Sequence, residues 1–286
     1  MTFDLFATFD QTLMEPVIAF IGKAVSGVSS WISGPFKVAA LLYIVMYGYM
    51  VLTGAVTEPV GQFVRNCIRI AAVAFLIDAG HYTSYVTDLF FTSLPNEIGS
   101  AINSKPMDAS SFDSILNAAG DTITKILNLV GSLSPTTWVY PILAAMIAIM
   151  AIVVSGIGYS VSVIAKIGLA LVLALGPVFV AMYLFQATRR FTEAFIGQIV
   201  NYVTLQVLVV ALGSIIMTTL KHYTDVGTGD GWILNQVLTV TLQFSVVSLV
   251  SAILFFQLPG IAASLAAGGS QIAMNLPGRR ALAPLK

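Results

Sequence analysis

Long uncharged stretches dominate the hydrophobic pattern of this chain, and short polar segments separate them. Residues 38–57, 194–220 and 231–278 carry no charge, and residues 138–187 carry a single one, Lys166. A helix that crosses a bilayer needs about 20 mostly apolar residues. The pattern therefore predicts membrane-spanning helices in all four stretches, the last with its helical core at 233–257.

A weaker candidate for a crossing lies at residues 60–79. Its mostly apolar centre, residues 67–77, is short, and Arg65 and Arg69 lie near one end. Long basic side chains near the end of a span can extend to the headgroups. We therefore predict a further crossing here, the second along the chain.

The segments outside these stretches have their own pattern. Near the start, one helical stripe carries Leu13, Val17, Phe20, Ala24 and Val28, which predicts an amphipathic helix along the membrane surface. The long polar stretch 80–137 carries apolar residues at helical spacing over 112–133 and predicts a small, partly helical extramembrane domain. The chain therefore divides into residues 1–37, 38–79, 80–137, 138–258 and 259–286.

Composition supports an all-α, polytopic membrane fold. Hydrophobic residues make up 57% of the 286 residues and charged residues only 9%, against about 25% in soluble domains. Zero net charge argues against a surface that coats nucleic acid, which would be strongly basic. The single Cys67 excludes an internal disulfide. The start of the chain is acidic and lacks Lys and Arg, the reverse of a signal peptide.

Charge also predicts the orientation, because Lys and Arg beside short loops favour the cytoplasm. Arg65 and Arg69 place the first connection inside, which puts the N-terminus and the acidic 80–137 segment outside. Arg189-Arg190 and the basic C-terminal tail then belong inside, which requires an odd number of crossings between 138 and 188. That run is long enough for two helices, so six crossings remain the alternative to the five that we predict.

The layout and one local motif resemble a known family. The layout has a weak second span and one large central outer loop. The motif is Leu173-Ala-Leu-Gly-Pro-Val-Phe-Val180 followed by Phe185-Gln-Ala-Thr-Arg-Arg-Phe-Thr-Glu-Ala-Phe195. Both are similar to the TrbL-like inner-membrane subunits of type IV secretion and conjugation systems. The family usually shows a Trp soon after a Phe-Glu pair, where this chain offers Phe195.

The resemblance implies a multi-pass protein of the bacterial inner membrane, with a periplasmic N-terminus and central loop and a cytoplasmic tail. It implies a channel or scaffold subunit that contacts DNA or protein in transit and helps to assemble the stalk and pilus. It further implies a homo-oligomeric ring, membrane lipid around it, and partners among the other envelope subunits and the cytoplasmic ATPases.

Two positions are candidates for a pathway or hinge. Lys166 is a lone cation in a long apolar run, where a central charge costs about 2.5–3.5 kcal/mol on insertion scales; the alternative is that it marks a turn between two helices. Gly176-Pro177 removes a backbone donor, which indicates either a bend beside a pathway or an ordinary packed kink.

Two further sets carry polar chemistry. Arg189, Arg190 and Glu193 form a collar before the next helix, with Arg189 and Glu193 at a spacing that allows an ion pair. The collar either contacts an ATPase or substrate, or anchors the topology. Apolar helices also carry the amides Asn201, Gln206 and Gln243, which favour hydrogen bonds between helices over a pore lining.

The motifs of enzymes are missing from the sequence. It contains no phosphate-binding Gly-x-x-x-x-Gly-Lys-Ser/Thr, no His-Glu-x-x-His and no Gly-x-Ser-x-Gly. We therefore expect no catalytic residue, no cofactor and no metal. The alternative function is a stand-alone secondary transporter or channel for a small solute, which would need a polar site at the membrane midplane.

Overall fold

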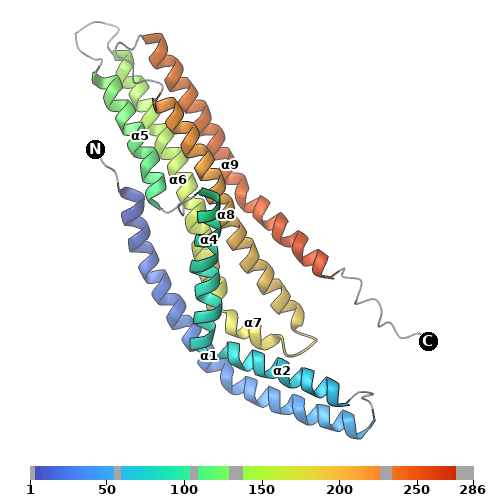
Figure 1. Ribbon diagram of the computed structural model, residues 1–286. Coiled ribbons are helices and arrows are strands. Elements are labelled where there is room, and N and C mark those ends of the chain that lie inside the picture. The colour runs from blue at the N-terminus through green and yellow to red at the C-terminus, as the bar shows by residue number, and fades with distance from the viewer. Residues whose placement is uncertain (1–3, 55–58, 104–108, 129–137, 226–233, 275–286) are drawn as a thin grey trace. The chain divides into compact units, whose positions relative to one another are not determined.

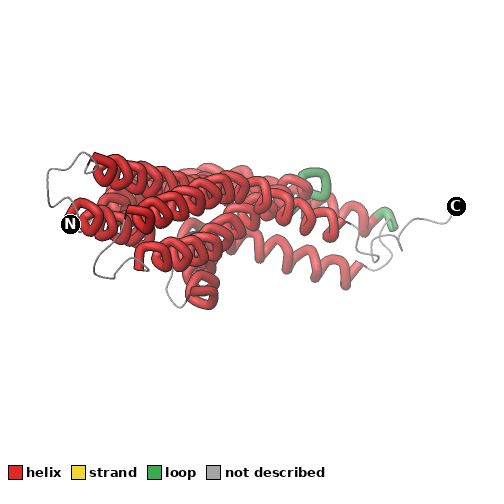
Figure 2. The backbone as a smooth tube through the Cα atoms, turned by 90° about the horizontal axis from the view of Figure 1, so that it is seen from above, coloured by secondary structure: helices red, strands yellow, loops and turns green. Residues whose placement is uncertain are grey.

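The computed structural model describes residues 4–54, 59–103, 109–128, 138–225 and 234–274, and every regular element in those ranges is a helix (Figures 1 and 2). In chain order the elements are α1 (Leu5–Leu52), α2 (Pro59–Ile77), α3 (Ala79–Tyr82), two π-helical turns η1 (Thr83–Thr87) and η2 (Leu89–Ser93), α4 (Leu94–Asn103), α5 (Ala109–Asn128), α6 (Val139–Ala174), α7 (Gly176–Met182), α8 (Arg189–Asp225) and α9 (Leu234–Met274).

Four of these helices are long and apolar enough to cross a membrane: α1, α6, α8 and α9. Each of them contains most of one of the four uncharged or nearly uncharged stretches. The predicted second crossing corresponds to α2, which is not among the four. A total of five or six crossings therefore stays a prediction.

Helix α1 runs without a break through the predicted boundary between residues 37 and 38, although it contains Pro16 and Pro35. Its buried face also lies one position later than the predicted stripe. Ile21, Val25 and Ser29 are buried, whereas Phe20 is 50% exposed. The stripe was misplaced because the partner surface that selects the buried face comes from residues far along the chain.

The C-terminal end of the bundle differs in a similar way. The predicted helical core stops before Pro259, but α9 continues through Pro259 to Met274. A proline removes one backbone donor, and an apolar helix tolerates this loss where its neighbours pack against it. Ala262 and Ala266 beyond the proline are buried. The basic residues of the tail, from Arg279 onward, lie outside the described residues.

The chain forms two compact units. The first contains residues 1–15, 95–166 and 204–263, and its core joins α5, α6, α8 and α9, which run side by side in Figure 1. From α5 come the buried residues Phe112, Ile115, Ala119 and Ile126. The amphipathic helix predicted in the central segment therefore exists, but it buries its apolar face against the long apolar helices rather than standing apart from them.

The second unit contains residues 16–94, 167–203 and 264–286. Small apolar clusters hold it together, and two of them share Val180 of α7 as a partly buried neighbour. One cluster packs Phe36 of α1 against Val73 of α2 and Ala181 of α7. Another packs Ile21 and Val25 of α1 against Tyr82 of α3. This unit therefore positions α2, α3, α7 and the first turns of α8.

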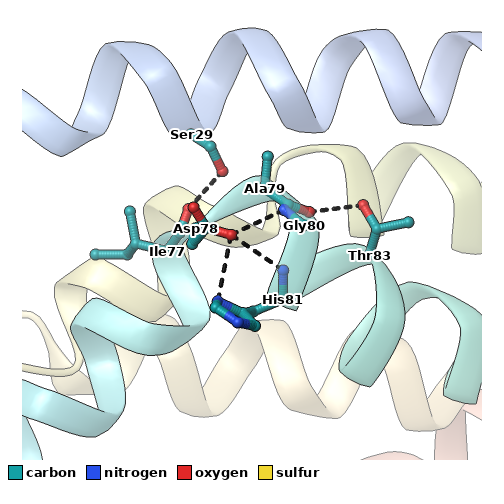
Figure 3. Close-up of polar contacts among 7 residues, drawn as sticks. All are labelled: Ser29, Ile77, Asp78, Ala79, Gly80, His81 and Thr83. Atoms are coloured by element: carbon teal, nitrogen blue, oxygen red, sulfur yellow. Dashed lines mark hydrogen bonds and ion pairs between the residues drawn. The ribbon is translucent and has the colours of Figure 1, made fainter.

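The turn between α2 and α3 is closed by hydrogen bonds (Figure 3). The Ser29 hydroxyl of α1 donates to the carbonyl of Ile77 at 2.6 Å. The Asp78 carboxylate accepts from the backbone N–H groups of Gly80 and His81 and caps α3. Asp78 thus ends α2, and its carboxylate also lies 3.3 Å from the His81 Nδ1.

Candidate functional site

Lys166 lies inside α6 and not at a turn, so the interpretation as a turn between two helices is wrong. Its Nζ donates to both carboxylate oxygens of Asp10 at 3.1 Å, with 28% of the Lys166 side chain and 19% of the Asp10 side chain exposed. The Tyr159 hydroxyl donates to the same carboxylate at 3.4 Å. A charge in an apolar helix is tolerated where an opposite charge neutralises it, and Asp10 of α1 is that charge.

The start of α1 is also held by a second carboxylate. Asp113 of α5 is only 2% exposed and accepts from the backbone N–H groups of Phe6 at 2.9 Å and Ala7 at 2.8 Å. These are two of the N–H groups that the first turn of a helix leaves without a partner, and the helix dipole there favours a negative charge. Asp113 therefore caps a helix that lies more than a hundred residues earlier in the chain.

Aromatic rings surround this polar cluster. The Phe6 ring lies 4.9 Å from the Tyr159 ring and 6.3 Å from the Phe112 ring, and Phe112 contacts Phe255 of α9. Burial beside these rings keeps water away from the Asp113 carboxylate and strengthens its hydrogen bonds, whereas Asp10 stays partly exposed. Sequence reasoning missed Asp10, Asp113 and Tyr159. The one local signal was the position of Asp113 beside the apolar stripe of α5. That position did not show which residue Asp113 would contact.

The break at Gly176-Pro177 is present. Helix α6 ends at Ala174, α7 begins at Gly176, and Pro177 stands in its first turn. In a continuous helix the carbonyl of Leu173 would accept from the N–H of residue 177, which proline lacks. The Tyr82 hydroxyl donates to that carbonyl at 3.0 Å instead. The Leu173 carbonyl therefore keeps a donor at the break, and the role of the break as a hinge stays a prediction.

Tyr82 is completely buried, and a Cβ added to Gly176 would overlap its phenol. Glycine at 176 is thus required by the close approach of this ring. Burial raises the pKa of the Tyr82 phenol above its ordinary value. The hydroxyl therefore keeps its proton and remains a donor to Leu173.

The predicted collar is built around one tyrosine. The Arg189 Nε lies 3.4 Å from a Glu193 carboxylate oxygen, which confirms the predicted pair. The same guanidinium donates to the Tyr183 hydroxyl at 3.3 Å and lies 4.8 Å from the centre of its ring. Arg69 of α2 lies 5.9 Å from the centre of the same ring. Arg190 contacts Phe191 instead, at 5.2 Å.

The collar is joined to α7 through Thr192. Its hydroxyl donates to the carbonyl of Phe179 at 2.6 Å, and the rings of Phe179 and Phe195 stack with centroids 5.0 Å apart. The spacing of the Leu173–Phe195 motif therefore has a structural reason: it folds α7 back against the first turns of α8. Phe195 is buried in this contact.

The hydrogen bonds between helices that we expected of the three amides stay a prediction. The Asn201 Oδ1 and the Gln206 Nε2, both in α8, are buried without a partner among the described residues. Gln243 in α9 is exposed. Buried hydroxyls of Ser155, Thr241, Ser245 and Ser248 likewise lack a partner within the described ranges. A pore-lining role for the amides stays untested.

The described residues contain no group of three or more His, Cys, Asp or Glu side chains that could hold a metal ion. The polar groups of the site instead serve helix ends and ion pairs. They fix the start of α1, the break after α6 and the start of α8. Such an arrangement can set the positions of helices in a bilayer.

Comparison with known proteins finds relatives over most of the chain. Residues 40–258 match the model of the family described as TrbL/VirB6 plasmid conjugal transfer protein. The chain is 36% identical over 270 residues to the type IV secretion system protein VirB6 of Bartonella quintana, covering 94% of this chain and 81% of the relative. The VirB6 protein of Bartonella henselae is 35% identical with the same coverage. Protein VirB6 of Agrobacterium fabrum is 24% identical over 231 residues, 76% of this chain and 70% of the relative.

Proposed function

Because this chain belongs to the TrbL/VirB6 family, we propose that it is a channel or scaffold subunit of a type IV secretion system in the bacterial inner membrane. In this role it helps to move DNA or protein across the envelope and supports assembly of the stalk and pilus. The observation that carries the proposal is the similarity to VirB6 proteins over 94% of the chain. Because that similarity covers 94% of the chain, it extends into each of the four apolar helices.

The proposed topology has five crossings, with the N-terminus and the 80–137 segment in the periplasm and the C-terminus in the cytoplasm. Two features support it. Between residues 138 and 188 there is one long helix followed by the seven-residue α7, as a single net crossing requires. Arg69 and Arg189 also lie against one Tyr183 ring, so both cations occupy the same depth, as cytoplasmic placement of both requires.

The topology is tested by labelling a single cysteine with a membrane-impermeant maleimide in intact cells. Gln186 is exposed next to the collar, and Cys67 is the only native cysteine. In a Cys67→Ser background, Gln186→Cys should react only after the inner membrane is permeabilised. Reaction in cells whose outer membrane alone is permeabilised would place the collar in the periplasm and overturn the five-crossing arrangement.

The subunit role is further supported by apolar side chains that the fold leaves uncovered. Large residues on α1, α6 and α9 are more than half exposed, among them Leu41, Ile149 and Phe256. In a bilayer such faces contact lipid or neighbouring subunits. We propose that these partners are further copies in a homo-oligomeric ring and the other envelope subunits of the system, while the cytoplasmic collar faces its ATPases.

The alternative is a stand-alone transporter or channel for a small solute. Such proteins bind their substrate at polar groups near the midplane. Lys166 was the main candidate for such a group, but its charge is neutralised by Asp10. Solute flux catalysed by the purified chain alone in liposomes would favour the transporter and count against the secretion role.

The direct test of function is substrate transfer in a strain that lacks the gene. Deletion of residues 80–137 would be uninformative, because it removes α5 and its buried residues from the first unit. We therefore expect loss of transfer in the null strain, and restoration by the wild-type chain. The tagged chain should co-purify with other secretion subunits from detergent extracts. Normal transfer in the null strain would overturn the proposal.

A further inference from the structure

Two positive charges share one aromatic ring in the second unit. The guanidinium carbons of Arg69 in α2 and Arg189 in α8 lie 5.9 Å and 4.8 Å from the centre of the Tyr183 ring. The electron-rich face of a ring attracts a cation. The ring does not cancel the mutual repulsion of two cations that lie near it, and an anion beside them would relieve that repulsion.

The protein supplies only part of that negative charge. Glu193 pairs with Arg189 at 3.4 Å. Within the described ranges, no carboxylate lies within ion-pair distance of Arg69 or of Arg190. Arg69 is nevertheless half-buried, where an unpaired guanidinium is costly. The cluster formed by Arg69, Tyr183 and Arg189, which we call the Tyr183 cluster, therefore has two positive charges and only the Glu193 carboxylate as a negative one.

The surroundings of the Tyr183 cluster are apolar and exposed. Ile68, next to Arg69, is 64% exposed, Phe191 is 44% exposed and Ile196 is 52% exposed. Water-facing cations that bind nucleic acid are not usually surrounded by uncovered aliphatic and aromatic side chains. Cations at the boundary between apolar side chains and water are typical of the headgroup level of a membrane.

We infer that the Tyr183 cluster binds the phosphate of an anionic membrane phospholipid, with Arg69 and Arg189 as the donors. A guanidinium presents parallel N–H groups that match two oxygens of a phosphate. The Tyr183 hydroxyl accepts from Arg189 at 3.3 Å and holds that guanidinium in place. Neighbouring apolar side chains contact the acyl chains of the same lipid. This inference goes beyond the role in secretion and does not depend on it.

The experiment uses the full chain, purified in detergent and stripped of lipid. Native mass spectrometry follows the addition of phosphatidylglycerol or phosphatidylcholine with identical acyl chains. We expect phosphatidylglycerol to bind about tenfold more tightly to the wild type, and Arg69→Gln or Arg189→Gln to remove most of this preference. Arg65→Gln is the matched control. It removes an arginine from the same helix, exposed and bonded to Gly61 of its own turn, and it should leave the preference unchanged.

Further arms separate a lipid site from other anion sites. The inference would be overturned if Arg65→Gln lost the preference for phosphatidylglycerol as much as Arg69→Gln does. Equal binding of the two lipids by the wild type would also overturn it. Displacement of phosphatidylglycerol by the same concentration of inorganic phosphate would show a site for free phosphate. Arginine-dependent binding of a short DNA duplex in place of lipid would show a nucleic-acid site. Either result overturns the lipid assignment.

Circular dichroism and gel filtration establish that each variant is folded. Should a glutamine variant lose its helical structure, Arg69→Lys and Arg189→Lys replace it, because lysine keeps the charge but lacks the planar fork. We expect these lysine variants to lose a measurable part of the preference for phosphatidylglycerol. If both lysine variants kept the full preference for phosphatidylglycerol, positive charge alone would explain the binding, and the inference would be overturned.

Discussion

Lys166 in the interior of α6 and Asp10 near the start of α1 form an ion pair in which Nζ lies 3.1 Å from both carboxylate oxygens. The pair explains why a long apolar helix contains a lysine. It also fixes the register between two helices that are far apart in the sequence. Together with the Asp113 cap, it attaches the first turns of α1 to α5 and α6.

Substitution of either partner of this pair leaves the other charge unpaired, so the losses of stability from the two single substitutions should not be additive. Asp10→Asn leaves Lys166 without its counter-charge, and Lys166→Met leaves Asp10 in the same state. Because both side chains are partly exposed, we expect each single variant to lower the free energy of unfolding by about 1–3 kcal/mol. The double variant should lose less than the two single losses added together. Thermal unfolding in detergent measures all three; additive losses would show that the pair is not coupled.

The bond from Tyr82 to Leu173 predicts a rescue. Tyr82→Phe leaves the Leu173 carbonyl buried without a donor, at a cost of about 1–3 kcal/mol. Pro177→Ala restores the N–H that a continuous helix would offer to the same carbonyl. Tyr82→Phe should therefore cost less stability in the Pro177→Ala background than in the wild type. Hydrogen exchange at the end of α6 and thermal unfolding measure this, and an equal cost of Tyr82→Phe in both backgrounds would contradict it.

Gly176 should tolerate no side chain. A Cβ at this position overlaps the Tyr82 phenol, and we expect Gly176→Ala to destabilise the protein by about 1–3 kcal/mol through overpacking. Gly197→Ala is the matched control, because nothing lies within 4 Å of an added Cβ there and alanine favours a helix. Unfolding midpoints compare the two; equal midpoints would mean that Tyr82 moves aside without cost.

Adjacent phenylalanines of α9 test the proposed ring. Phe256 is 74% exposed, whereas Phe255 is fully buried. With a photo-crosslinking phenylalanine analogue at position 256, irradiated membranes should yield adducts with a second copy or another secretion subunit. The same analogue at 255 should crosslink only within its own chain. Adducts of position 256 with lipid alone would place this face against the bilayer rather than against a neighbouring subunit.

Local features were well predicted from the sequence. The four uncharged or nearly uncharged stretches became the four long apolar helices, because transfer from water to lipid depends on the composition of each segment alone. The break at Gly176-Pro177 and the Arg189–Glu193 pair are also present, since proline chemistry and the helical repeat act over a few residues. These features needed no knowledge of distant neighbours.

Contacts between distant residues depend on the tertiary structure alone. No spacing rule relates Asp10 to Lys166, Asp113 to the start of α1, or Tyr82 to Leu173, because each pair meets only after helices pack. The buried face of α1 and the docking of α5 are of the same kind: an amphipathic pattern shows that a face needs a partner, and only the fold supplies it. The sequence by itself thus determined which segments leave water and where a helix breaks. The tertiary structure decided which charges and hydroxyls complete one another, since those energies arise at distances that local chain geometry does not set.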